Sequence, residues 1–164
     1  MSTNKPKGRN DGHIMDYSKI TDKIYIGSDL CKGADCPVHT KEFKKLKIGA
    51  EVNLNKERKE IPPDGILSYI WIPVADGDTP SQGQFEMGTS AINEAVKKGH
   101  NVYVHCKNGH GRSPAMVAAY LTRFKKKTPK EAEKIIKEKR PEIHIEKIQM
   151  AGLIKYSKIY KKNG

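Results

Sequence analysis

Residues 102–114 of the chain read VYVHCKNGHGRSP, and this stretch decides the fold class. The apolar run that opens it has no polar alternation before His105, which predicts a strand buried on both faces. A short loop with two glycines follows, and from about Arg112 the segment RSPAMVAAYLTRF has the apolar density of a core helix. A buried strand, a tight loop and a buried helix in this order are typical of an α/β protein.

The segments on either side follow the same alternation. Residues 22–27, 50–55 and 68–74 have the composition of strands, and we expect helices over residues 39–49 (with Thr40 as cap), about 81–98, 128–140 and 145–160. The sequence therefore predicts one α/β domain over residues 16–164, with a central, partly parallel sheet flanked by helices, behind a flexible basic tail of residues 1–15. In such folds ligands bind beyond the carboxyl ends of the strands, where residues 105–113 fall.

The net charge of the chain limits the classes of partner that it could bind. The 164 residues carry a formal net charge of +12, which favours phosphorylated, nucleic-acid or anionic-membrane partners. Nucleic acid is disfavoured, because no aromatic residues interleave the lysine runs; contact with an anionic membrane surface stays open. The first residues do not read as a secretory signal, and no run approaches the roughly 20 apolar residues of a membrane span. We expect a cytoplasmic monomer, with any membrane contact peripheral.

The three cysteines do not form a disulfide framework, because their number is odd and the chain is long. Cys31 and Cys36 lie near His39, but a structural zinc site needs four ligands and no second ligand pair is visible. We read these two cysteines as ordinary thiols in a loop whose role stays open. Cys106, at the end of the buried strand, is different.

The loop after Cys106 has the chemistry of an anion cradle. Backbone N–H groups converge where a loop enters a helix N-terminus, and the helix dipole adds positive potential there. Arg112 can offer two parallel donors to a tetrahedral oxyanion, and a thiol in this environment ionises with a pKa of roughly 3.5–7.5. A thiolate beneath a bound phosphate is placed to attack phosphorus. The expected phosphate-binding residues are Lys107, Asn108, Gly109, His110, Gly111 and Arg112.

At this point the residues show a family resemblance. HCKNGHGRS resembles the His-Cys-x5-Arg-Ser/Thr signature of the cysteine-dependent protein tyrosine phosphatases. IYIG and VNLN resemble the dual-specificity branch, and VYVHCK with RSPAMVAAYL is similar to its phosphatidylglycerophosphate phosphatase subgroup. The resemblance spans nearly the whole chain and implies the dual-specificity phosphatase fold, with no metal and no cofactor.

The resemblance also implies roles. Cys106 would be the nucleophile that forms a phosphocysteine intermediate, and Arg112 would bind the phosphoryl oxygens. Ser113 would donate to the thiolate as it leaves in the second step. His105 would brace the loop without touching the substrate.

A general acid is still needed to protonate the leaving group. PVADGDTPSQGQF offers Asp76 and Asp78, and relatives with a similar string use the aspartate before the glycine, which is Asp76 here. Asp78 is the reserve candidate. Gln149 is expected to be structural, and Glu57 is taken as an ordinary exposed charge, although it could orient Arg112.

Three functions remain open at this stage. The first is a metal-independent phosphatase acting on phosphotyrosine and on phosphoserine or phosphothreonine. The second keeps the chemistry but takes a phospholipid or phosphoinositide headgroup, or an RNA 5′ phosphate; Lys107 directly after the cysteine suits such a headgroup, or it points to solvent. The third is a non-catalytic module that binds phosphorylated partners.

Overall fold

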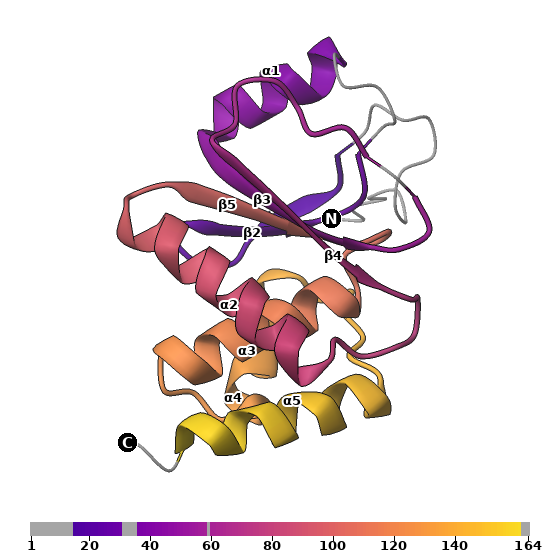
Figure 1. Cartoon of the computed structure of the whole chain (residues 1–164), viewed down its shortest axis with the longest axis vertical. Coiled ribbons are helices and arrows are strands. Elements are labelled where there is room, and N and C mark those ends of the chain that lie inside the picture. Colours follow the sequence, from indigo (N-terminus) through magenta and orange to yellow (C-terminus); the bar gives the residue numbers. More distant parts are fainter. Residues whose placement is uncertain (1–14, 31–35, 59, 162–164) are drawn as a thin grey trace.

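The computed structural model describes residues 15–30, 36–58 and 60–161 and arranges them as a central sheet with helices on both faces (Figure 1). The predicted tail lies outside the described residues except for Met15, and Cys31 lies outside them too. The strands are β1 (Tyr17–Lys19), β2 (Ile24–Gly27), β3 (Ile48–Asn55), β4 (Ser68–Val74) and β5 (Asn101–His105). The helices are α1 (Pro37–Leu46), α2 (Gln82–Lys97), α3 (Arg112–Phe124), α4 (Pro129–Lys139) and α5 (Lys147–Lys161).

The described strands form one sheet in the order β1-β2-β5-β3-β4. β1 is antiparallel to β2 and the other pairs are parallel, so the predicted partly parallel sheet is confirmed. β1 was not predicted, because three residues are too few to show a period of two. β3 begins at Ile48, two residues before its predicted start at Ala50.

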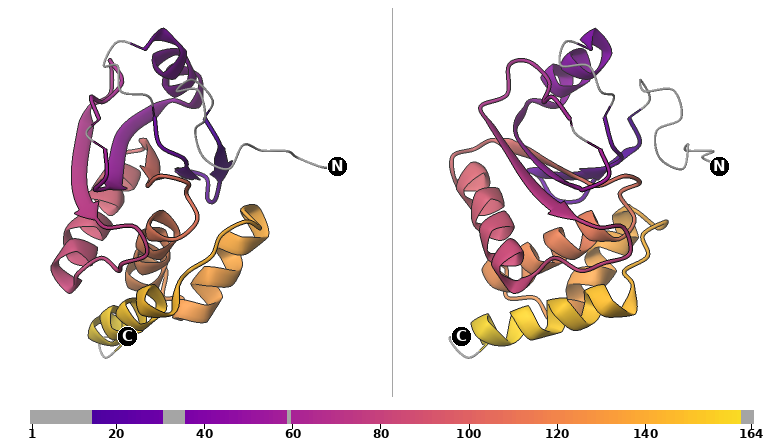
Figure 2. Two further views of the ribbon diagram at one scale, coloured as in Figure 1. Left: turned by 90° about the vertical axis from the view of Figure 1, so that its right-hand side faces the viewer. Right: turned by 45° about the vertical axis from the view of Figure 1, so that its right-hand side comes forward.

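The central strand β5 separates two cores. Because successive side chains of a strand point to opposite faces, Val102 and Val104 enter one core and Tyr103 enters the other. Among the described helices, α1 covers the face of Tyr103, while α2 to α5 lie on the other side of the sheet (Figures 1 and 2).

Helix α3 is the buried centre of the larger core. Every residue from Ser113 to Thr122 is buried, which confirms the predicted core helix. Two helices that pack against it, α2 and α4, begin with capping motifs that can be seen in the sequence. α2 and α4 each begin with a full capping box, in which Ser81 and Thr128 are the N-caps.

The first helix begins earlier than expected. Thr40 was predicted as its cap, but α1 starts at Pro37 with Cys36 in the N-cap position. Proline is favoured at the first helical position because its fixed φ suits the helix and its missing N–H would have no intrahelical partner. None of the described helices has the length and apolarity needed to cross a membrane.

The packing beside α3 predicts one stability result. Phe85 on α2 is fully buried and stacks on Tyr156 of α5, with 5.3 Å between ring centroids. Phe85→Ala should lower the free energy of unfolding by about 3–5 kcal/mol, because it leaves a cavity in the core. Met87→Ala on the same helix, where the side chain is 63% exposed, should change it by less than about 0.5 kcal/mol. Urea unfolding measures both; equal losses would contradict this view of the core.

Candidate active site

The candidate site lies at the carboxyl end of β5, as predicted. We call residues 106–111, which connect β5 to α3, the cysteine loop. The segments that follow β3 and β4 contribute Glu57 and Asp76 beside it. Because β3, β4 and β5 are parallel, their carboxyl ends meet at one edge of the sheet, and this edge carries the site.

The carbonyl groups of the cysteine loop are bound by the structure around it. Lys107 O accepts from Asp29 N–H (3.0 Å), Asn108 O from Arg140 Nη2 (3.0 Å), Gly109 O from Arg140 Nε (2.9 Å), His110 O from His144 N–H (2.6 Å) and Gly111 O from Ala115 N–H (3.0 Å). Since the C=O and N–H of one planar peptide point in opposite directions, the loop's N–H groups face inward. This is the geometry of an anion cradle.

The inward direction of the N–H groups is seen directly at Gly109. Its N–H donates to Cys106 Sγ at 3.3 Å. Its φ of 72° lies in the left-handed region, and a Cβ there would come within 2.6 Å of Gly27 O. Only glycine fits this position without moving backbone.

The thiol of Cys106 lies inside the loop, 3% exposed. Its Sγ is 3.3 Å from Ser113 Oγ. Burial alone would raise the pKa of the Cys106 thiol, but the Arg112 guanidinium and hydrogen bonds from Ser113 and Gly109 hold it below its usual value. The arrangement therefore favours a thiolate, which is the nucleophilic form of cysteine.

Arg112 is held rigidly by groups from β4 and from the segment after β3. Its Nη1 donates to Val74 O (2.7 Å), and its two terminal nitrogens bind the two carboxylate oxygens of Glu57 at 2.7 and 3.2 Å. Glu57 is exposed, as predicted, but it is not an ordinary surface charge: it orients Arg112, which is the alternative left open by the sequence. Glu57 Oε1 also accepts from Asp76 N–H (3.1 Å), so one carboxylate joins the arginine to the loop that carries the acid candidate.

The two aspartates of that loop differ in their contacts. Asp76 Oδ1 lies 3.5 Å from Arg112 Nη2, and its side chain is 76% exposed. Asp78 Oδ1 instead accepts from Thr79 N–H at 2.8 Å and so caps its own turn. The structure therefore brings Asp76, and not the reserve candidate, to the arginine.

His105 lies behind the loop, within a buried network. Its Nε2 is 2.7 Å from Glu51 and 3.1 Å from Glu60, and its Nδ1 is 3.2 Å from Cys106 O. Burial alone would lower the pKa of His105, yet the carboxylates of Glu60 and Glu51 raise it well above its usual value. Burial and the neighbouring Glu60 raise the pKa of Glu51 well above its usual value. This position behind the loop agrees with the prediction that His105 braces the loop.

The same cluster contains the residues that could act as ligands to a metal ion. Among the described residues, Asp29, Glu60 and His105 each offer one ligand atom within 4.8 Å of the others. Asp29 also lies 3.3 Å from Arg58, and His105 Nε2 faces two carboxylates. Two cations already balance these carboxylates, so we interpret the cluster as an ion-pair network that supports the loop. The absence of a catalytic metal stays a prediction.

Arg140 is the site residue that the sequence analysis missed. It follows α4, is fully buried, and is the donor to the carbonyls of Asn108 and Gly109. Asp16 pairs with it at 3.1 Å, and Ser18 accepts from it at 3.1 Å. These contacts join residues more than 120 positions apart, so no local pattern could have revealed them.

The remaining predicted residues line the rim or lie apart. Lys107 is exposed, while Asn108 and His110 are half-buried. Gln149 is buried and donates to Asp78 O (3.0 Å), in line with its expected structural place. Cys36 is buried in the N-cap position of α1 and belongs to no metal-ligand group among the described residues.

Comparison with known proteins supplies the family. Residues 30–159 match the family described as dual specificity phosphatase, catalytic domain, and the chain belongs to it. Laforin of Mus musculus is 29% identical over 85% of this chain and 49% of its own length. The phosphatidylglycerophosphate phosphatase PTPMT1 of Arabidopsis thaliana is 26% identical over 85% of this chain and 42% of its own length. The predicted family resemblance is thereby confirmed.

The fold agrees with that of a solved structure. The crystal structure of human DUSP28 superimposes with a TM-score of 0.76 at 22% identity, covering 88% of this chain and 95% of that one. This confirms the predicted fold class. The chain spans about half the length of the curated relatives named above.

The thiol's environment predicts a pH effect. Because the pKa of Cys106 is lowered, its alkylation by iodoacetamide should stay fast below the pH of about 8.5 at which free cysteine ionises. Ser113→Ala removes a hydrogen bond to the thiolate and should move the midpoint of the alkylation rate upward by about one pH unit. Rates measured from pH 5 to 9 give both midpoints; an unchanged midpoint would show that the hydroxyl does not stabilise the thiolate.

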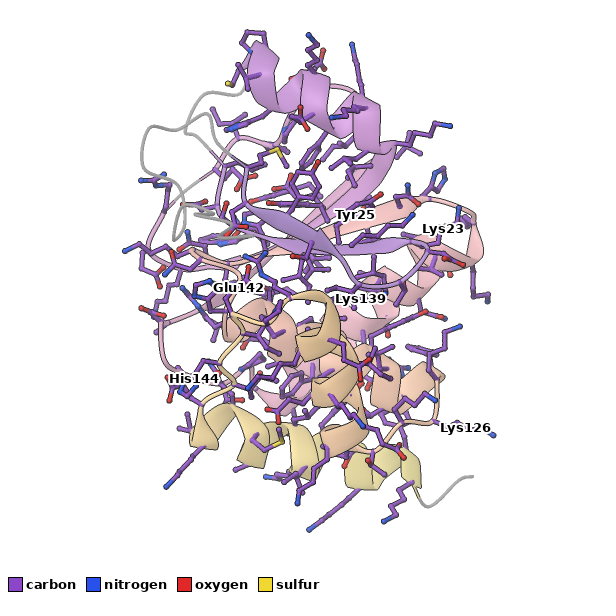
Figure 3. The ribbon with its side chains drawn as sticks, turned by 180° about the vertical axis from the view of Figure 1, so that it is seen from behind. Lys23, Tyr25, Lys126, Lys139, Glu142 and His144 are labelled. Carbon is purple, nitrogen blue, oxygen red and sulfur yellow. The ribbon has the colours of Figure 1, made fainter. Side chains whose placement is uncertain are left out.

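The Arg140 contacts predict an effect on anion binding. Arg140→Lys keeps the buried charge beside Asp16, but the one nitrogen of an ammonium group cannot reach all the acceptors that Arg140 binds from three separate nitrogens. Affinity for tungstate, a tetrahedral phosphate mimic, should fall by about tenfold, as measured by calorimetry on protein shown to be folded. Lys139→Gln, at the exposed neighbouring position (Figure 3), is the control and should bind like the wild type.

Proposed function

We propose that this chain is a metal-independent phosphatase that hydrolyses phosphomonoesters through a phosphocysteine intermediate. One observation carries the proposal: a thiol with a lowered pKa lies inside a loop whose carbonyls are all bound on the outside. The inward N–H groups and Arg112 suit the three terminal oxygens of a phosphate. The phosphorus atom would then stand directly over Cys106 Sγ.

In the first step the Cys106 thiolate attacks phosphorus. The S–P bond forms while the P–O bond to the leaving group breaks, and Asp76 gives its proton to the departing oxygen. Arg112 stabilises the charge on the equatorial oxygens. Because Glu57 and Val74 O already fix its guanidinium, little reorganisation is required as charge develops.

In the second step water attacks the phosphocysteine. Asp76, now ionised, takes a proton from this water, the S–P bond breaks, and inorganic phosphate leaves. The electron pair returns to sulfur, and the Ser113 hydroxyl, 3.3 Å away, donates to the re-formed thiolate. The cycle needs only water and a phosphomonoester.

We propose phosphotyrosine, and phosphoserine or phosphothreonine after it, as the substrates, since the family is named for dual specificity. A phospholipid headgroup is the second candidate, because a relative similar over 85% of this chain is named a phosphatidylglycerophosphate phosphatase. The exposed Lys107 at the mouth of the loop suits either anion. A non-catalytic phosphate-binding module is disfavoured, because binding alone does not require a lowered thiol pKa. The cytoplasmic location, the monomeric state and peripheral membrane contact stay predictions.

The test is hydrolysis of p-nitrophenyl phosphate and phenyl phosphate in EDTA. Cys106→Ser should abolish turnover of both. Asp76→Asn should lower kcat by roughly 10²–10⁴-fold, and more for phenyl phosphate, whose poorer leaving group depends more on the acid. Asp78→Asn is the matched control and should stay within about threefold of the wild type.

Two results would contradict the proposal. Wild-type protein that binds tungstate without any turnover would favour the binding module. Equal effects of the two aspartate variants would remove Asp76 from the mechanism. Once turnover is established, kcat/KM is measured for a phosphotyrosine peptide and for dispersed phosphatidylglycerophosphate. The higher value shows whether protein or lipid is the preferred substrate.

A further inference from the structure

A second cavity lies at the far end of α3 from the active site. It has a volume of about 710 Å³ and is enclosed by the last turn of α3, the connection to α4, the start of α4 and the end of α5. α3 has 13 residues, so at 1.5 Å per residue its two ends are about 20 Å apart. Arg112 begins this helix and Arg123 nearly ends it, so the cavity does not belong to the catalytic site.

The described walls of this cavity carry five exposed lysines and no carboxylate. We therefore call it the basic cavity; the lysines are Lys126, Lys127, Lys130, Lys158 and Lys161. Within the described part of the chain none of these lysines forms an ion pair. Lys127 does attract Glu131, but that carboxylate accepts from Thr128 N–H as part of the α4 cap.

Arg123 also lines the basic cavity, but its charge is already paired with a carboxylate. Its guanidinium pairs with Glu86 at 3.0 Å and donates to Ser90 Oγ at 2.7 Å. It also lies over the ring of Tyr160, 4.8 Å from the ring centroid. Arg123 therefore fixes one wall, while the five lysine ammonium groups stay available.

Lys126 lies at the rim of the basic cavity, where α3 ends. Its φ of 56° is left-handed, which is common for the residue just past a helix; Lys47 at the end of α1 has the same conformation. Figure 3 shows the Lys126 side chain pointing away from the body of the molecule at this end. Its ammonium group is therefore open to solvent at the rim.

We propose that the basic cavity binds a small molecule that carries two or three phosphate groups. Each phosphomonoester has a charge of about −1.5 to −2, so two or three of them match five ammonium groups. The volume falls within the roughly 300–1,000 Å³ of small-molecule sites. Pro129, Ile154 and Tyr160 give it apolar surface for the carbon skeleton that joins the phosphates.

Other occupants fit the observations less well. A membrane surface is flat, whereas these lysines lie on α4, α5 and the preceding connection around one hollow. The chain's own first 14 residues carry Lys5, Lys7 and Arg9 against Asp11, so their charge repels the cavity. A compact phosphorylated molecule matches both the concavity and the charge.

The test is calorimetry with inorganic tripolyphosphate on the Cys106→Ser protein, with saturating tungstate in the catalytic loop. The catalytically inert background makes the result independent of the proposed phosphatase activity. We expect one tripolyphosphate per chain. Lys126→Gln together with Lys158→Gln should weaken this binding at least tenfold, because two charge-assisted contacts are lost. In the active background the same pair should leave p-nitrophenyl phosphate hydrolysis unchanged.

The matched control removes the same charge elsewhere. Lys44→Gln together with Lys45→Gln, on the exposed side of α1, should change the affinity by less than about threefold. Equal weakening by both pairs would mean that tripolyphosphate responds only to net charge, and the proposal would fall. It would also fall if tripolyphosphate bound only when tungstate was left out, or if the cavity pair weakened binding to phosphatidylserine vesicles but tripolyphosphate did not bind.

Discussion

The orientation of five peptide groups in the cysteine loop is the constraint on which the site depends. A loop of this length has no regular secondary structure to direct its N–H groups, so its carbonyls must be bound from outside. Arg140 binds two of them, and Asp29, His144 and Ala115 bind the others through backbone N–H groups. The cradle is therefore assembled by segments from the whole length of the domain.

Burying Arg140 explains why β1 belongs to the fold. A fully buried guanidinium without a partner is strongly unfavourable, and removing one member of a buried pair costs about 3–5 kcal/mol. Asp16, just before β1, supplies the carboxylate and Ser18 within it supplies a further acceptor. A three-residue edge strand contributes little packing of its own, but it places the counter-charge of the residue that orients the loop.

The sequence predicts structure that depends on neighbouring residues, but it does not predict contacts between residues far apart in the chain. The buried strand, the core helix and the cysteine loop follow from apolar periodicity and glycine spacing, which act over a few residues. The capping boxes at Ser81 and Thr128 are likewise local. Arg140 reads as one more surface cation at the end of a lysine-rich helix, and Glu57 as one more charge in a polar loop. Their pairing with the cysteine loop and with Arg112 depends on sheet order, which no short pattern contains.

The charges at the two ends of α3 are arranged differently. At the start of α3, Arg112 is paired with Glu57, and Arg140 behind the loop is paired with Asp16. At the other end, five lysines line a hollow, and none of its described lining residues carries a carboxylate. The 13 residues of α3 separate the two ends by about 20 Å. A phosphorylated molecule in the proposed site would touch neither Cys106 nor Arg112, so it would be held on the protein without direct contact with the reacting atoms.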